Sequence, residues 1–154
     1  MTLASVSDET GGSAFTTDGA PIIKGFSYQE SEAVMSSAEI FRTCLQRFTS
    51  GDTVGAAELL TDDFRFHGPM LQSQGKVAFL ECSAPLGPIM RGAEIHRQWE
   101  DGGELCSFYD FKIETAAGVG SIPMAEWNSF RDGKLASARL IFDTAAMAAL
   151  MPGS

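Results

Sequence analysis

Three side chains that could exchange protons lie in the second half of the sequence, at His96, Tyr109 and Glu126. A glutamate placed beside Phe111 and Met124 would be partly desolvated, and desolvation raises the pKa of a carboxyl group. Glu126 could then act as a general acid, with Tyr109 as its hydrogen-bonding partner. His96 could act as a base near neutral pH. These residues can do such chemistry only if the chain brings them to one face of a sheet.

The segment Glu104–Asp143 must position them, because it predicts three long strands joined by two tight turns. Ala117-Gly118 ends the first strand and Asp132-Gly133 the second, and Asp-Gly between apolar runs is a strong hairpin signal. A two-residue loop at Ala117-Gly118 pairs Tyr109 with Glu126, and alternating side chains of both strands then share one face. That face holds Ser107, Tyr109, Phe111, Ile113, Ile122, Met124, Glu126 and Asn128. It is apolar at one end and polar at the other, as in a ligand pocket.

The turn before this segment decides where His96 lies. If Asp101–Gly103 leaves two residues unpaired, His96 lies opposite Tyr109 or Ser107 and completes a row with Glu126. A three-residue loop turns His96 to the other face of the sheet. The sequence leaves both registers open.

The second hairpin turn sets the surroundings of Glu126. A two-residue turn pairs Glu126 with Arg139, and that ion pair would lower the pKa of the carboxyl group. A one-residue bulge within Phe130–Lys134 places Leu140 and Phe142 on the pocket face instead. In the bulged register Glu126 stays isolated and acid-like.

The other metal-binding or nucleophilic side chains are few and scattered. His67 ends a short strand, Phe64–Gly68, and is either a surface histidine or a second base at the pocket. Two histidines without further ligand spacing do not predict a metal site. The three cysteines lack Cys-x-x-Cys spacing, which predicts free thiols in a reducing compartment. No phosphate-binding loop or dinucleotide fingerprint is present, so we expect neither a metal nor a cofactor.

The composition is that of an ordinary globular domain. The 154 residues are 44% apolar and have a formal net charge of −9. Basic residues are scattered, so neither nucleic acid nor an anionic membrane is an expected partner, because both need a basic surface. No apolar run would span a bilayer, and residues 1–20 lack the features of a signal peptide. We therefore expect a cytoplasmic protein.

The surrounding elements predict an α+β domain. Residues 1–26 are rich in Ser, Thr, Gly and Asp and predict a flexible N-terminal arm, whereas residues 27–151 predict a single domain. Capping-box spacing at Ser27–Glu30 predicts a helix of about 20 residues that starts near Tyr28. Its apolar stripe is Val34, Ala38, Phe41, Leu45 and Phe48. Further helices are expected at Thr53–Leu60, Gly75–Ser83 and Thr144–Leu150, and further strands at Phe64–Gly68 and Ile89–Glu100.

This order of elements resembles the nuclear-transport-factor-2-like superfamily, and within it the SnoaL-like and ketosteroid-isomerase-like small-molecule proteins. The resemblance rests on Ser50-Gly51-Asp52, Leu59–Phe64, Trp127–Lys134 and Ile141–Thr144. It implies a cone-shaped, curved antiparallel half-barrel with three helices packed on its concave side, around a buried pocket. It also implies a homodimer. The expected interface is the apolar outer face of the sheet, with Cys106, Phe108 and Trp127.

The catalytic positions of the related enzymes are partly kept in this sequence. By resemblance, the base of ketosteroid isomerases falls at Gly68, their hydrogen-bonding tyrosine at Cys44 and their protonated acid at Glu126. The last-strand acid of SnoaL-type cyclases and of limonene-epoxide-hydrolase-like enzymes falls at Leu140. Of these positions, Glu126 keeps its chemistry.

Together these observations predict a protein that binds a small apolar or cyclic ligand. The expected ligand contacts are Cys44, Phe66, Ser107, Phe111, Ile122, Met124, Asn128, Leu140 and Phe142. As an enzyme it would run cofactor-free acid/base chemistry of the isomerase, cyclase or hydratase/hydrolase type. Glu126 would be the proton donor and Tyr109 its partner, with His96 or His67 as the base. The alternative is a non-catalytic ligand-binding or dimerisation module of the same fold.

Overall fold

The computed structural model describes residues 11–16, 18–19 and 34–151. In its first part, Gly11–Thr16 (β2) pairs in antiparallel fashion with Asp18–Gly19 (β3), in a two-stranded sheet of their own. Apart from these two strands, the predicted arm over residues 1–26 lies outside the described residues, and so does the predicted helix start near Tyr28.

The second part begins at Ser36 and contains the helices and strands of an α+β unit. Its elements are α3 (Ser37–Thr49), α4 (Thr53–Ala57), β4 (Leu60–His67), β5 (Gln72–Gln74), α5 (Lys76–Ser83), β6 (Met90–Asp101), β7 (Glu104–Thr115), β8 (Gly118–Arg131), β9 (Lys134–Phe142) and α6 (Thr144–Leu150). The predicted α+β class is confirmed. Among the described residues, no helix has the length and apolar character that a membrane span needs.

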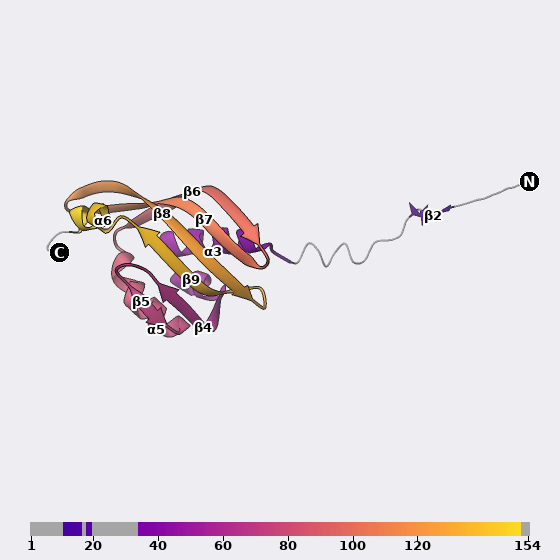
Figure 1. The fold of residues 1–154 in the computed structure, drawn as a ribbon, viewed down its shortest axis with the longest axis horizontal. Coiled ribbons are helices and arrows are strands. Elements are labelled where there is room, and N and C mark those ends of the chain that lie inside the picture. Colours follow the sequence, from indigo (N-terminus) through magenta and orange to yellow (C-terminus); the bar gives the residue numbers. More distant parts are fainter. Residues whose placement is uncertain (1–10, 17, 20–33, 152–154) are drawn as a thin grey trace, which may run out of the picture. The chain divides into compact units, whose positions relative to one another are not determined.

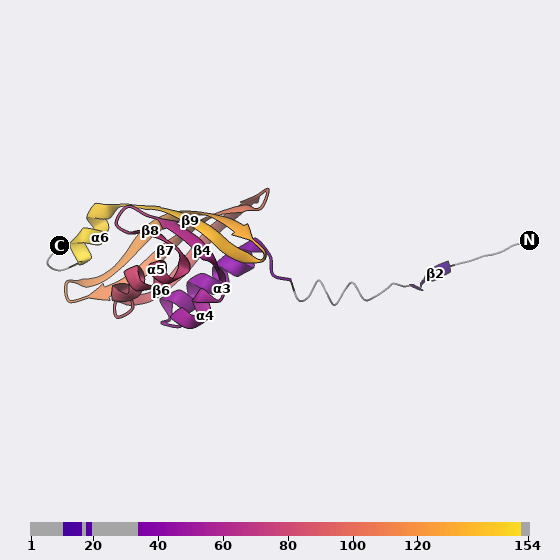
Figure 2. The ribbon, with the colours of Figure 1, turned by 90° about the horizontal axis from the view of Figure 1, so that it is seen from below.

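Six strands form one curved sheet in the order β5-β4-β9-β8-β7-β6. Helices α3, α4 and α5 cover its concave side (Figure 2), and α6 lies at one end of the sheet (Figure 1). The predicted cone-shaped half-barrel is confirmed, with one difference in strand direction. The pairing of β4 with β9 is parallel, whereas the other pairings in this sheet are antiparallel. These two strands are far apart in the sequence, so no hairpin fixes their relative direction.

Helix α3 is shorter than the sequence predicted. Ser36 is its N-cap: the Ser36 hydroxyl accepts from the backbone N–H of Glu39 at 3.1 Å, and the Glu39 carboxylate accepts from the Ser36 N–H at 3.2 Å. Val34 lies outside the helix and is 73% exposed, so it does not belong to the buried stripe. The sequence contains Ser-x-x-Glu twice, at Ser27 and Ser36, and the second copy is the one that starts the helix.

The turn between β7 and β8 lies one residue earlier than predicted. Thr115 pairs with Gly118, which leaves Ala116 and Ala117 as the loop. The expected pairing of Tyr109 with Glu126 is therefore wrong, because Tyr109 lies opposite Met124. The shift of two positions keeps every side chain on its predicted face, since side chains alternate with a period of two.

The turn between β8 and β9 is the two-residue Asp132-Gly133, with φ of 55° and 75°, as a type I′ hairpin requires. Beyond it, Ala136 is an extra residue in β9, because Leu135 pairs with Phe130 while Ser137 pairs with Ser129. This bulge places Leu140 opposite Glu126 and Phe142 opposite Met124, as the bulged alternative predicted. It lies in β9, however, and not within residues 130–134.

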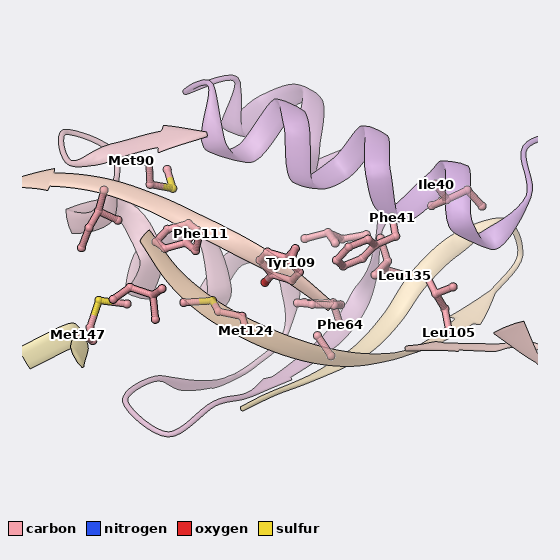
Figure 3. Close-up of a cluster of buried hydrophobic side chains, with 14 residues drawn as sticks. Ile40, Phe41, Phe64, Met90, Leu105, Tyr109, Phe111, Met124, Leu135 and Met147 are labelled. Atoms are coloured by element: carbon pink, nitrogen blue, oxygen red, sulfur yellow. The ribbon is translucent and has the colours of Figure 1, made fainter. Parts of the chain in front are cut away.

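The core lies between α3 and the concave face of the sheet. Phe41 of α3 packs against Tyr109 of β7, with ring centroids 5.9 Å apart (Figure 3). Met124 of β8 and Met147 of α6 extend the cluster toward the end of the sheet where α6 lies (Figure 3). Each such side chain contributes about 1.5–3 kcal/mol on burial, which holds the helices against the sheet.

Candidate functional site

The concave side of the sheet encloses a cavity of about 240 Å³. Its wall comes from α3, α4, β4, α5, β7, β8, β9 and α6 and from the loops beside them. The aromatic rings on it are Phe41, Phe48, Phe64, Phe66, Phe79, Tyr109, Phe111 and Phe142. Polar side chains on the described wall come from Cys44, Ser83, Tyr109 and Glu126. An apolar cavity with a few convergent polar groups is the usual form of a small-molecule site.

Three hydrogen-bonded side chains lie at the polar end of the cavity, with Tyr109 and Glu126 on its wall and Asn128 behind them. The Tyr109 hydroxyl donates to Glu126 Oε1 at 2.7 Å, and Asn128 Nδ2 donates to Glu126 Oε2 at 3.0 Å. Glu126 and Asn128 are two residues apart on β8 and so point to the same face, and Tyr109 reaches Glu126 diagonally from β7. All three side chains are buried.

Burial raises the pKa values of both ionisable groups in this set, Glu126 and Tyr109. Loss of solvation raises the pKa of Glu126 above its ordinary value, although the hydrogen bonds from Asn128 and Tyr109 act in the opposite direction. Burial also raises the pKa of Tyr109, and the charge of Glu126 raises it further. The phenol therefore keeps its proton, and the carboxyl group is the one whose protonation state can change. A carboxyl group of this kind can donate a proton or a hydrogen bond inside an apolar site.

The other two polar groups on the wall are occupied within the protein. Cys44 Sγ lies 3.6 Å from the Ala56 carbonyl, and burial raises the pKa of the Cys44 thiol to about 12. A neutral thiol is a poor nucleophile. Ser83 Oγ donates to the Phe79 carbonyl at 2.7 Å, within α5. Neither group is poised for covalent chemistry.

His96 does not join the set. The turn after β6 has the two-residue form that would put His96 opposite Tyr109, but a bulge at His96 gives that place to Ile95. The His96 side chain instead pairs with Asp110, with Nε2 3.1 Å from Oδ2, and its ring lies 6.2 Å from that of Phe108. The predicted row of His96, Tyr109 and Glu126 is therefore not formed. The bulge inserts one extra residue into β6, and this changes the residue that lies opposite Tyr109.

His67 is also away from the cavity wall. It is the last residue of β4, exposed, and paired in the sheet with Gln72 and Arg139. Its neighbour Phe66 lines the cavity, and alternation along the strand turns His67 outward. Over the described residues, the cavity wall therefore contains no histidine.

The predicted ligand contacts divide into two groups. On the cavity wall lie Cys44, Phe66, Phe111, Met124, Leu140 and Phe142. Fully buried beside it, without reaching the wall, lie Ser107, Ile122 and Asn128. Ser107 accepts a hydrogen bond from Gln98 at 3.1 Å, and Asn128 donates a hydrogen bond to Glu126. Contact of any of these residues with a ligand stays a prediction.

Apart from Cys44, sequence reasoning missed the part of the wall that the helices supply. Phe41 and Phe48 of α3 and Phe79 of α5 line the cavity together with Phe64 of β4. The apolar stripe of the first helix contained two of these rings, and it could have been assigned to the pocket as well as to the core. Across residues 34–151, no group of three or more His, Cys, Asp or Glu side chains is arranged to hold a metal ion.

The outer face of the sheet carries exposed aromatic side chains on β6, β7 and β8, among charged residues such as Asp110 and Lys112. Trp99 is 51%, Phe108 43% and Trp127 52% exposed, and these residues lie on the face opposite Tyr109 and Glu126. Trp127 Nε1 donates to Glu104 Oε1 at 3.1 Å, which ties the indole of β8 to the neighbouring strand β7. Exposed aromatic side chains gathered on one sheet face are typical of an interface.

Comparison with known proteins agrees with this geometry. Solved structures with a similar fold include an NTF2-like protein of unknown function from Cytophaga hutchinsonii (17% identity, 74% of this chain and 96% of that chain, TM-score 0.64). Another is a hypothetical protein with a ketosteroid isomerase-like fold from Catenulispora acidiphila, in complex with trimethylamine (12% identity, 75% of this chain and 93% of that chain, TM-score 0.67). A third is a candidate SnoaL-like polyketide cyclase from Mesorhizobium loti (23% identity, 69% of this chain and 98% of that chain, TM-score 0.55). A comparison with curated protein sequences finds no match.

The model of the SnoaL-like domain family matches residues 41–138, which run from α3 to β9. This stretch supplies Cys44, Tyr109, Glu126 and Asn128, and it ends within the strand that contains the Ala136 bulge. The chain belongs to the SnoaL-like domain family, and its fold is that of the nuclear-transport-factor-2-like superfamily, as the sequence resemblance predicted.

Proposed function

We propose that this protein binds a small, uncharged apolar or cyclic molecule in the cavity and that the Glu126–Tyr109 pair gives it a hydrogen bond or a proton. The observation that carries the proposal is a buried carboxyl–phenol pair at one end of an otherwise apolar cavity of about 240 Å³. No lysine or arginine lies on the described wall, so a ligand anion would find no counter-charge there. An oxygen acceptor on a ring system suits the site best.

As an enzyme, the protein would be a cofactor-free isomerase, cyclase or hydratase/hydrolase. Because neither histidine reaches the described wall, the roles of acid and base fall to one group, Glu126. It would give its proton to the substrate in one step and take a proton back in the next. The ketosteroid isomerase-like fold of the Catenulispora acidiphila protein and the candidate cyclase from Mesorhizobium loti support this class of chemistry.

A non-catalytic ligand-binding protein is the second candidate. It is favoured by the same wall, which offers one carboxyl group and no second base among the described residues. Such a protein would hold its ligand by apolar contact and one hydrogen bond, without turnover. It would also pair with a second copy of itself, and the outer sheet face with Phe108 and Trp127 is the surface that we propose for this contact.

The binding proposal can be tested with 1-tetralone, a two-ring ketone with one oxygen acceptor. Leu140 lines the cavity, whereas its neighbour Ile141 points outward and is 64% exposed. We expect Leu140→Trp to fill the cavity and to weaken binding more than tenfold by calorimetry, and Ile141→Trp to leave it unchanged. Circular dichroism checks that both variants fold. Equal affinity in both variants would place the ligand elsewhere.

Turnover separates the two candidates. Cyclic enones, epoxides and lactones are followed by absorbance and mass spectrometry at a series of pH values. An enzyme that uses Glu126 should lose the reaction in Glu126→Gln and should show a pH dependence set by that carboxyl group. Binding of these compounds without conversion of any of them would favour the ligand-binding protein.

A further inference from the structure

Asn128 is fixed in one orientation behind Glu126. Its Nδ2 donates to Glu126 Oε2 at 3.0 Å and lies 3.4 Å from the Ser137 carbonyl oxygen of β9. Turning the amide over would direct Asn128 Oδ1 at the Ser137 carbonyl oxygen, which can only accept whether Glu126 is charged or neutral. Asn128 Oδ1 is buried and has no hydrogen-bond partner among the described residues. The two contacts of the nitrogen therefore fix the amide at the cost of one unsatisfied carbonyl.

This orientation distinguishes the two oxygens of Glu126. Oε2 accepts a hydrogen bond from the Asn128 amide N–H, and an amide N–H can only donate. Oε1 instead faces the Tyr109 hydroxyl at 2.7 Å. A hydroxyl oxygen can donate or accept. A buried carboxylic acid needs an acceptor for its O–H, and Tyr109 Oη supplies one within reach of Oε1. The proton of a neutral Glu126 therefore belongs on Oε1, and Tyr109 accepts it.

Tyr109 then has to direct its own proton elsewhere, and it lines the cavity. We infer that Tyr109 is the group that donates the hydrogen bond to the ligand, with the neutral Glu126 donating to Tyr109 from behind and Asn128 as the positioning residue. This inference rests on the proposed function, because it names the atom of the same site that meets the ligand. It assigns the ligand class as a neutral molecule with an oxygen acceptor.

The same arrangement would allow a proton to pass from Glu126 through Tyr109 to the ligand. Tyr109 passes its hydroxyl proton to the ligand oxygen and takes the proton of Glu126 Oε1 in the same movement. The ligand gains one proton, Tyr109 stays neutral and Glu126 becomes a carboxylate. The carboxylate then accepts from the Tyr109 hydroxyl and from Asn128 Nδ2, along the two contacts of 2.7 Å and 3.0 Å. No further reactant is needed.

The orientation can be tested in the full chain without a ligand. In Glu126→Gln, Asn128 Nδ2 requires an acceptor, so the glutamine oxygen should face Asn128 and its amide nitrogen should face Tyr109. NMR should then show nuclear Overhauser contacts from the Gln side-chain amide protons to the Tyr109 ring. Contacts to the Asn128 side-chain amide in their place would overturn the inference.

Binding of a matched ligand pair gives the second test. 1-Tetralone and tetralin differ at one ring carbon, which bears the ketone oxygen in tetralone, so their affinity ratio reports the hydrogen bond. We expect Tyr109→Phe to lower this ratio about threefold to tenfold at a pH where Glu126 is neutral, while tetralin binds as before. In the unchanged protein the ratio should fall as pH rises through the pKa of Glu126, because Tyr109 turns its proton back to the carboxylate. Glu126→Gln should remove that pH dependence.

These measurements distinguish the role of Tyr109 as hydrogen-bond donor from ligand binding in the cavity. An unchanged ratio in Tyr109→Phe would make Glu126 the direct donor and overturn the inference, while binding in the cavity would still stand. Failure of both compounds to bind the unchanged protein would count against the proposed function. The NMR contacts of Glu126→Gln would still decide the orientation of the hydrogen bonds in that case.

Discussion

Burial of the Glu126 carboxyl group destabilises the folded chain. The group lies among apolar side chains, and its burial raises its pKa. Asn128 and Tyr109 stabilise the charged form only in part, and the Asn128 carbonyl is left without a partner. A carboxyl group whose pKa is raised by burial and that faces a cavity is a candidate for a functional role.

The free energy of unfolding should therefore depend on pH through the ionisation of Glu126. Because the pKa of Glu126 is higher in the folded than in the unfolded chain, its contribution is fully present below the ordinary value of 4.5 and is lost as pH rises through the folded-state pKa. The free energy of unfolding relative to Glu126→Gln should fall by up to about 1.4 kcal/mol per pH unit in that window. Urea unfolding at a series of pH values measures it. A difference that is flat with pH would contradict the raised pKa.

Asn128 should control the acidity of Glu126. Replacement by leucine removes the N–H that stabilises the carboxylate, so the pKa of Glu126 should rise further in Asn128→Leu. The ¹³C shift of the Glu126 carboxyl carbon, followed by NMR against pH, measures the change. Ser107→Ala is the matched control, because Ser107 is opposite Glu126 in the sheet but bonds to Gln98. A fall in the pKa in Asn128→Leu would show that the amide does not act on the carboxylate.

At the scale of elements, the start of α3 depends on a reciprocal cap. Ser36→Ala removes both the acceptor for the Glu39 N–H and the geometry of the return bond, and should lower the free energy of unfolding by about 1 kcal/mol. Ser37→Ala, at the first helical position, should have a much smaller effect, because alanine suits a helix. Denaturant unfolding of both variants measures the difference. Equal effects would mean that the cap contributes nothing.

Elements with strong local signals could be predicted from the sequence, whereas the positions of the bulges could not. Asp143 followed by an Ala-rich run predicted α6 with both ends correct. Asp132-Gly133 predicted its hairpin, and the resemblance favoured the register that places Leu140 inward. Nothing in the residues around His96 marks the extra residue there, because a bulge is decided by the neighbouring strand. The acid half of the site was therefore predictable, and its supposed base was not.

At the scale of the whole molecule, the sheet has apolar residues on both faces. The concave face is covered by helices, whereas Phe108 and Trp127 remain exposed on the outer face. If a second copy covers this face, Trp127→Asp should weaken self-association more than tenfold in sedimentation velocity. Val77→Asp, on α5 and 67% exposed, is the matched control and should have no effect. A monomeric unchanged protein would exclude the dimer.

The bulge at Ala136 acts on the rest of β9 as a single-nucleotide insertion acts on a reading frame. With the extra residue, Leu140 and Phe142 face the cavity and Arg139 pairs with Trp127 on the outer side. If β9 paired with β8 without this bulge, Ala136 would lie opposite Ser129, and Arg139 and Ile141 would turn inward, with Arg139 opposite Glu126. The cavity would gain a cation and its carboxyl group a partner. One chemically inert residue, itself outside the cavity wall, thus keeps a cation away from Glu126.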